Sequence, residues 1–149
     1  MPDVRAIQLG EEEMVIVPCR CGPLRLRRGR SLDVMTIETH AATWASIRSG
    51  LAGLRRQYGI DVRIADRLES FTAIGQMARQ GWSHGLVPAG IAEALGVPLA
   101  ATCRFPGRSV RRPISLLGRP TTFERGSMQG LQGALEACLS GRGPIGKQR

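Results

Sequence analysis

A chain of 149 residues with 42% hydrophobic and 22% charged residues is a folded globular protein, neither disordered nor fibrous. This length makes one ordinary domain or two small lobes, and it needs no disulfide or metal to hold a core. No apolar run approaches the length of a membrane span, and residues 1–13 lack the basic start and apolar centre of a secretory signal. We therefore expect a cytoplasmic protein without a membrane partner.

The net charge of +9 comes almost entirely from arginine, because Lys147 is the only lysine among 21 basic residues. High Gly and Ala alongside this bias suggest a GC-rich genome, so charge alone argues weakly for nucleic acid. One dense cluster occupies a Gly- and Pro-containing stretch without aromatic residues, and it comprises Arg20, Arg25, Arg27, Arg28 and Arg30. The cluster can attract phosphate but offers no stacking surface. A solvated basic loop and a nucleic-acid contact both fit it.

The four cysteines do not have the spacing of a zinc site. Cys19 and Cys21 form a lone C-x-C, whereas Cys103 falls in an expected strand and Cys138 on the apolar stripe of an expected helix. Free cysteines in such positions pack as small hydrophobic side chains. We expect burial of the last two, no metal and no cofactor.

The first half of the chain opens with two expected strands, at 4–9 and 12–17, the second fully apolar from Met14 to Val17. A basic loop covers 19–31. A short strand at 33–38 is followed by a helix, with Thr39 as a possible N-cap and Gly59 at its end.

The second half continues the alternation of strand and helix. A strand is expected at 60–68, then a helix capped by Ser70 and ended by Gly81, then a strand at 84–88. The expected elements after these are a short helix at 90–95, a strand at 99–104, a turn at 105–109, a buried strand at 112–118, and a last helix with an apolar stripe through Met128, Leu131, Leu135 and Cys138. Alternation with short loops predicts right-handed βαβ units and a largely parallel sheet.

One catalytic motif is matched by residues 81–85, which read G-x-S-x-G. The nucleophile elbow of α/β hydrolases needs a strand before the serine and a helix after it. Here a helix precedes Ser83 and a strand follows, and no histidine lies downstream of His84 to act as base. We interpret the motif as a helix-to-strand turn and expect His84 to bond a backbone group. No other set of acid, base and nucleophile is apparent, so we do not expect an enzyme.

Two junctions between a strand and the following helix combine hydroxyl side chains with the free N–H groups of a helix start. They are Glu38-Thr39-His40 and Glu69-Ser70-Phe71-Thr72, and a third junction at 88–90 adds backbone only. In an open parallel sheet, ligands bind outside the carboxyl ends of the strands. These junctions suit a small anionic or carboxylate-bearing molecule with Phe71 as an apolar wall, although Thr39 and Ser70 are explained equally well as ordinary helix caps.

The segment LESFTAIGQMARQGWSHGLVPAGIAEALG resembles the second half of the effector-binding domain of LysR-type transcriptional regulators. Its flanks agree, since AIQLGEEEMVIVP is similar to the strand pair that enters the second lobe and VRRPISLLGRPTTF to the returning strand. The resemblance covers about residues 4–140 in order. Where members of the family often carry a G-H-P-L loop, this chain has CGPLRLRR.

The resemblance implies an α/β fold of the type 2 periplasmic-binding-protein class, with two lobes and an effector cleft between them. Residues 1–18 and 99–140 would form part of the first lobe, 19–98 the complete second lobe, and 141–149 a flexible tail. The cleft positions it implies are Thr36, Glu38 and Thr39 at the first junction and Ser70, Phe71 and Thr72 at the second. His40 is a further candidate ligand-binding residue because it lies at the first strand-to-helix junction; the resemblance itself does not imply it.

The function expected from this resemblance is effector sensing for a transcriptional regulator. The helix-turn-helix that binds DNA and the opening half of the first lobe are missing, so the chain reads as truncated at its N-terminus, and the family implies a homo-oligomer. A first lobe without its opening half would leave apolar faces uncovered, so we expect self-association. Two alternatives remain: a stand-alone small-molecule binding protein of the same architecture, and a nucleic-acid-binding domain that uses the loop from Arg20 to Arg30.

Overall fold

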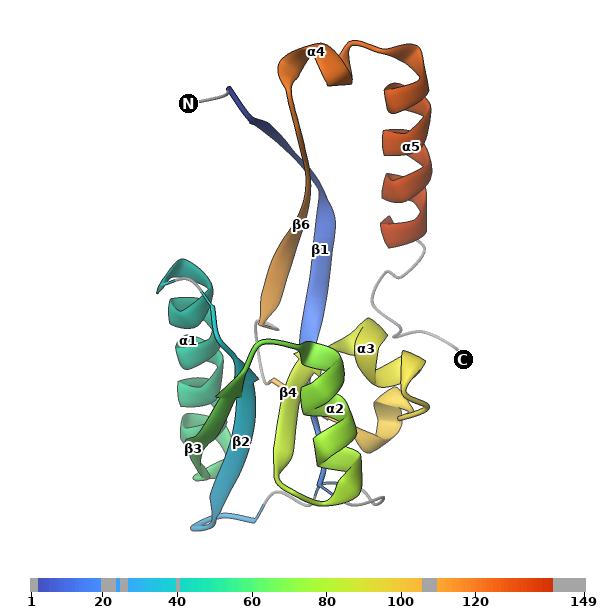
Figure 1. The fold of residues 1–149 in the computed structure, drawn as a ribbon. Coiled ribbons are helices and arrows are strands. Elements are labelled where there is room, and N and C mark those ends of the chain that lie inside the picture. Colours follow the sequence, from blue (N-terminus) through green and yellow to red (C-terminus); the bar gives the residue numbers. More distant parts are fainter. Residues whose placement is uncertain (1–2, 20–23, 25–26, 40, 106–109, 141–149) are drawn as a thin grey trace, which may run out of the picture. The chain divides into compact units, whose positions relative to one another are not determined.

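The computed structural model describes residues 3–19, 24, 27–39, 41–105 and 110–140 (Figure 1). The chain divides into two compact units. Unit 1 comprises Met1–Glu12 and Arg112–Arg149, and unit 2 comprises Glu13–Arg111.

Helices and strands alternate through most of the described chain. The strands are β1 (Arg5–Val17), β2 (Ser31–Ile37), β3 (Asp61–Leu68), β4 (His84–Pro88), β5 (Cys103–Arg104) and β6 (Arg111–Gly118). The helices are α1 (Ala41–Tyr58), α2 (Phe71–Gln80), α3 (Ala89–Ala94), α4 (Pro120–Phe123) and α5 (Gly126–Ser140), with a 3-10 turn η1 at Leu99–Ala101. No described helix is long and apolar enough to cross a membrane.

The sheet of unit 2 has the strand order β3-β2-β4-β1-β5. In the part built from βαβ units, β2 pairs with both β3 and β4 in parallel. The prediction of a largely parallel sheet is wrong for β1, which pairs with β4 and β5 antiparallel. The sheet is therefore mixed, with β1 running opposite to β4 and β5.

Two apolar clusters cover the two faces of this sheet. The α1 side chains Ile47, Leu51 and Leu54 pack on one face, together with Val34 and other strand residues. On the other face, side chains of α2 and α3 pack against alternate residues of the same strands, namely Val15, Val17, Met35, Ile74, Ala78, Val87 and Ala92. The fully apolar stretch that ends β1 is explained by this arrangement, since a strand covered on both faces has no polar side.

Local sequence signals correctly predicted the ends of several elements. Ser70 caps α2, its hydroxyl accepting the Ala73 N–H at 3.4 Å. Gly81 ends that helix with φ +89, and Gly59 and Gly96 also adopt positive φ after α1 and α3. Two predictions were wrong in detail. The expected strands at 4–9 and 12–17 are one strand, and 99–104 begins with the 3-10 turn Leu99–Ala101, so that only Cys103–Arg104 belongs to a strand.

Unit 1 consists of the first half of β1 paired with β6, followed by α4 and α5. The ion pair between Arg112 and Glu12 (2.8 Å) joins the two strands. The only buried hydrophobic side chain among the described residues of this unit is Phe123, which lies against Gly118.

Two expectations for this unit are corrected. The strand at 112–118 is not buried, because half-buried and exposed residues alternate along β6 and Leu117 is 68% exposed. The stripe of α5 covers no buried residue, so Cys138 is exposed, whereas Cys103 in unit 2 is buried as expected. Phe123 apart, the described apolar side chains of unit 1 stay at least partly exposed, although α5 lies close enough for a Cβ at Gly10 to be 3.3 Å from the Leu139 Cβ.

Candidate functional site

The two predicted junctions lie next to each other at one edge of the sheet of unit 2. The parallel register pairs Ile37 with Leu68, the last residues of β2 and β3. The backbone continues this pairing, since the Glu38 N–H donates to the Leu68 carbonyl at 2.9 Å. The segment at Glu38 and Thr39 therefore runs beside the segment that starts α2.

The start of α2 presents backbone donors at this edge. An α-helix leaves the N–H groups of its first turn without helical acceptors, and the Ser70 hydroxyl takes the one from Ala73. The helix dipole adds positive potential at the same place. Ser70 and Thr72 are exposed, whereas Phe71 is half-buried and packs against both core clusters. This arrangement can receive a small anion.

Thr36 lies below the surface of this edge, with 0% of its area exposed. Its Oγ1 is the one buried side-chain polar atom of the described residues without a hydrogen-bond partner. An orphaned hydroxyl costs about 1–3 kcal/mol relative to a satisfied one. Thr36 therefore carries an unused donor and acceptor one residue before the end of β2.

The remaining predicted site residues differ in how far they are exposed. Glu38 is exposed and Thr39 is half-buried, while His40 lies outside the described residues. Arg67, which pairs with Thr36 in the strand register, was not predicted as a site residue. Its guanidinium lies 4.8 Å from the centre of the Trp44 ring, a cation–π arrangement that holds a positive charge at this edge.

The G-x-S-x-G segment forms a helix-to-strand turn, as predicted. Ser83 donates its hydroxyl to the Asp33 carbonyl at 2.8 Å, and the Nδ1 of His84 accepts the Cys19 N–H at 3.0 Å. Burial lowers the pKa of His84, against the opposing attraction of Asp33. Serine and histidine are thus committed to backbone groups of different segments and do not form a nucleophile and base.

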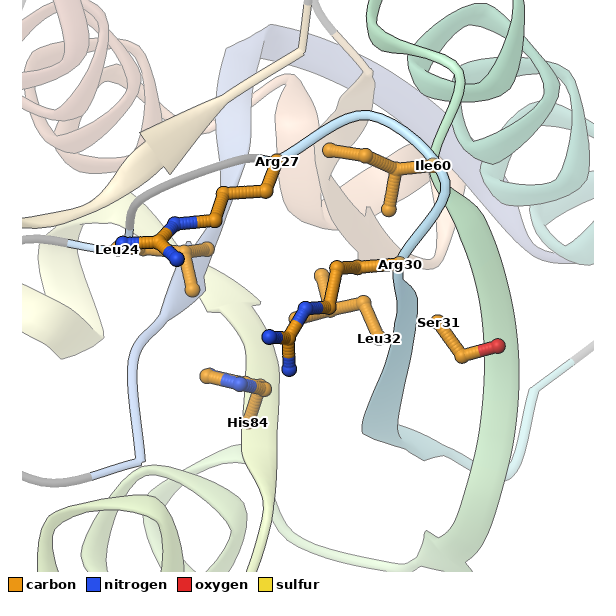
Figure 2. Close-up of a pocket in the computed structure, with 7 residues that line it drawn as sticks. All are labelled: Leu24, Arg27, Arg30, Ser31, Leu32, Ile60 and His84. Carbon is orange, nitrogen blue, oxygen red and sulfur yellow. The ribbon is translucent and has the colours of Figure 1, made fainter.

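A pocket that the sequence did not predict lies at the opposite edge, where the parallel strands of unit 2 begin (Figure 2). Arg27 and Arg30 of the basic loop line it together with His84. Sequence reasoning identified these arginines only as a charged loop, because nothing local indicates that residue 84 folds beside residue 30. Among the described residues no group of three or more His, Cys, Asp and Glu side chains could hold a metal, and Cys21 is not described.

Comparison with solved structures gives many matches, while no protein-family model and no curated protein matches the sequence. The CcmR regulatory domain of Synechocystis PCC6803, in complex with 2-PG, aligns over 94% of this chain and 69% of its own length, with TM-score 0.58 and 15% identity. The effector binding domain of QuiR in complex with shikimate aligns over 95% and 68%, with TM-score 0.56 and 15% identity. The bromide-bound regulatory domain of HypT from Salmonella typhimurium aligns over 90% and 66%, with TM-score 0.61 and 17% identity.

The chain has the fold of LysR-type regulatory domains. This confirms at the level of fold the resemblance seen in the sequence, and with it the α/β architecture of the type 2 periplasmic-binding-protein class. The chain spans about two thirds of the length of the three neighbours. Two of these neighbours are complexes with a small molecule, 2-PG in one and shikimate in the other.

Proposed function

We propose that this chain is the effector-sensing part of a LysR-type transcriptional regulator and binds a small anionic or carboxylate-bearing metabolite. On this proposal it is a cytoplasmic protein and not an enzyme, and it acts on DNA only through a helix-turn-helix outside these 149 residues. We assign residues 19–98, which lie within unit 2, to the second lobe, and residues 1–18 and 99–140 to part of the first.

The observation that carries the proposal is the adjacency of the two strand-end junctions. The Glu38 to Leu68 backbone bond holds Thr39 beside the start of α2, where Ser70 and Thr72 are exposed. Helix starts at the carboxyl ends of parallel strands are the usual anion sites of open α/β sheets. Arg67 adds positive charge, and the ligand's carboxylate would accept hydrogen bonds from hydroxyl and backbone donors.

The mechanism depends on a difference in ligand affinity between two arrangements of the protein. A ligand that binds one arrangement of the protein more tightly than another shifts the population toward the first. A regulator that uses this shift alters the arrangement of its subunits on DNA. The free energy that couples ligand binding to this change equals the difference between the ligand's binding free energies for the two arrangements. The exposed apolar side chains of unit 1 support assembly into a homo-oligomer.

The test is calorimetry with a panel of small organic acids that includes shikimate and 2-PG, on the full chain. The variant Thr39→Ala with Ser70→Ala removes both hydroxyls of the site. We expect the affinity for at least one acid that binds to fall by about tenfold or more, since hydrogen bonds to a charged group are each worth about 1.5–3 kcal/mol.

The matched control is Ser46→Ala with Ser49→Ala, which removes two hydroxyls from exposed positions of α1. Loss of the Ser70 cap costs about 0.5–2 kcal/mol of stability, so a thermal melt must show that both variants remain folded. Equal affinity in the site variant and the wild type would refute the assignment of these residues.

A further inference from the structure

The pocket of about 280 Å³ at the amino ends of the parallel strands is separate from the proposed effector site. Its wall is built where β2 and β4 begin, whereas the effector site lies where β2 and β3 end. Arg27 and Arg30 come from the loop before β2, and His84 is the first residue of β4. Figure 2 shows the Arg30 side chain extending toward the His84 ring.

The arginine loop is held in place by its own backbone. The Arg30 N–H donates to the Arg27 carbonyl at 3.2 Å, and the Gly29 N–H donates to the Gly59 carbonyl at 2.9 Å. Gly29 has φ +78, a left-handed conformation that a side chain would strain. The Asp61 N–H in turn donates to the Arg30 carbonyl at 3.1 Å. The two guanidinium groups are therefore carried by a fixed turn, which lowers the entropy cost of ligand binding.

The positive charge of the pocket is not neutralised within the described part of the chain. Neither Arg27 nor Arg30 makes a side-chain ion pair there. Two acidic side chains of β2 and β3 have other partners, since Asp33 pairs with Arg63 at 2.9 Å and Asp61 lies 4.0 Å from Arg55. The charge of Asp33 also acts on His84, where it opposes the lowering of the pKa by burial. Two guanidinium groups that line one cavity without a carboxylate form an anion site.

His84 contributes a hydrogen-bond donor of defined tautomer. Its Nδ1 accepts the Cys19 N–H at 3.0 Å, so the proton of the neutral ring sits on Nε2. Protonation of Nδ1 would place two hydrogens against each other, and burial also lowers the pKa of this ring. The neutral ring can therefore donate a hydrogen bond while the arginines supply the charge.

The rest of the lining consists of Ser31 and three apolar residues, Leu24, Leu32 and Ile60. These side chains favour a ligand that carries hydrocarbon as well as charge, because inorganic anions gain nothing from apolar walls. The volume is close to the lower limit of pockets for small organic ligands, about 300 Å³.

We propose that this pocket is a second ligand site that binds a small organic anion, a carboxylate or phosphate monoester with an apolar group, through Arg27, Arg30 and His84. It is independent of the effector site at the other edge of the sheet. The basic loop then serves ligand binding rather than nucleic acid.

The test is NMR on full-length protein labelled with ¹⁵N-histidine, which contains only two histidines, His40 and His84. Benzoate and phenyl phosphate are the probes. We expect at least one of them to shift the ring nitrogens of His84 in a saturable way, and the spectrum of the free protein to show the Nε2–H tautomer. Arg27→Gln with Arg30→Gln should weaken this binding about tenfold or more.

The control is Arg28→Gln, which removes one positive charge from the same loop at a residue that does not line the pocket, and it is compared with the single variant Arg30→Gln as well as with the double variant. The affinity of Arg28→Gln should stay within about twofold of the wild type. Amide spectra of all variants must show the folded protein. The proposal fails if neither probe shifts His84, or if Arg28→Gln weakens binding as much as the pocket variant. It also fails if only an oligonucleotide binds and all three arginines contribute equally.

Discussion

Unit 1 and unit 2 differ in how their apolar residues are covered. Unit 2 has helices on both faces of its sheet and contains every buried hydrophobic side chain of the described chain except Phe123. Unit 1 pairs two strands and adds α5, yet Val4 is 56% exposed, Leu117 68% and Leu131 47%. Similar apolar residues thus form a core in one unit and an open surface in the other.

This difference shows what an apolar pattern in the sequence can predict. It indicates which side chains share one face of a strand or helix, but it does not indicate whether another element packs on that face. β6 alternates in the same way as an ordinary half-buried strand, but α5 buries no residue of its own. Burial of a strand requires a second layer, and only unit 2 has one on each side among the described residues. Stability should therefore reside in unit 2, where the proposed ligand sites lie.

The largest expected contrast comes from truncating one leucine in each unit. Leu54→Ala removes a fully buried side chain of α1 and should cost about 2–5 kcal/mol of unfolding free energy, since it leaves a cavity. Leu131→Ala in α5 should change that free energy by less than about 0.5 kcal/mol. Urea unfolding followed by circular dichroism measures both. Equal losses would show that unit 1 has a core of its own.

Glycine-to-alanine substitutions should have opposite signs in the two units. A Cβ at Gly85 of β4 would lie 2.8 Å from Ile74 Cγ2 and 3.2 Å from the Ile74 carbonyl oxygen, so Gly85→Ala should cost about 1–3 kcal/mol. Gly130 of α5 has no neighbour within 4 Å of such a Cβ, so Gly130→Ala should stabilise the helix by about 1 kcal/mol. Helicity and the denaturant midpoint report each effect. A stabilising Gly85→Ala would contradict the packing of α2 on β4.

A smaller effect is expected from Thr36→Val, which replaces the orphaned hydroxyl with a methyl group of similar volume. Because the Thr36 Oγ1 has no partner among the described residues, its removal should leave stability unchanged or raise it by about 1 kcal/mol. The matched substitution Thr102→Val deletes a hydroxyl that donates to the Leu99 carbonyl at 2.7 Å, and it should destabilise. Thermal unfolding of the two variants distinguishes these cases. Destabilisation by Thr36→Val would mean that the hydroxyl is satisfied in solution.

The smallest predicted effect is a pH dependence that arises from His84. Burial lowers its pKa in the folded protein below the ordinary value of about 6.5, so the unfolded chain binds more protons in the window below that value. The stabilisation is complete above about pH 6.5 and is lost as the pH falls through this window. The melting temperature of His84→Gln should therefore fall less than that of the wild type between pH 7.5 and 5.5. Parallel curves would show that the His84 pKa is not lowered.

Much of unit 2 could be predicted because its signals are local. A serine before an apolar helix and a glycine after it marked the limits of α2, and a compact apolar run marked β4. The long β1 could not be predicted as one strand, because Gly10 reads as a break. In the structure this glycine lies close to α5, where an added Cβ would be 3.3 Å from the Leu139 Cβ.

The sequence could not predict which residues far apart in the chain come close together in the fold. The junctions at Thr39 and Ser70 were found because each follows a strand and opens a helix. The pocket at Arg30 and His84 was missed, since their proximity depends on the register of β2 with β4, which pairs Val34 with His84. Thr36 was expected at the ligand surface, and its depth beneath that surface depends on the packing of the finished sheet.

The central claim is that the edge formed by the ends of β2 and β3 binds the effector. The direct measurement is an ¹⁵N amide NMR titration of the full chain with a panel of small carboxylic acids, shikimate among them. We expect saturable shifts for at least one acid at the amides of Thr39, Thr72 and Ala73, and we expect these shifts to disappear in Thr39→Ala with Ser70→Ala. If every acid of the panel that binds leaves these amides unmoved, or if no acid binds, the assignment is contradicted, whereas an acid that shifts only the residues around His84 reports on the second pocket.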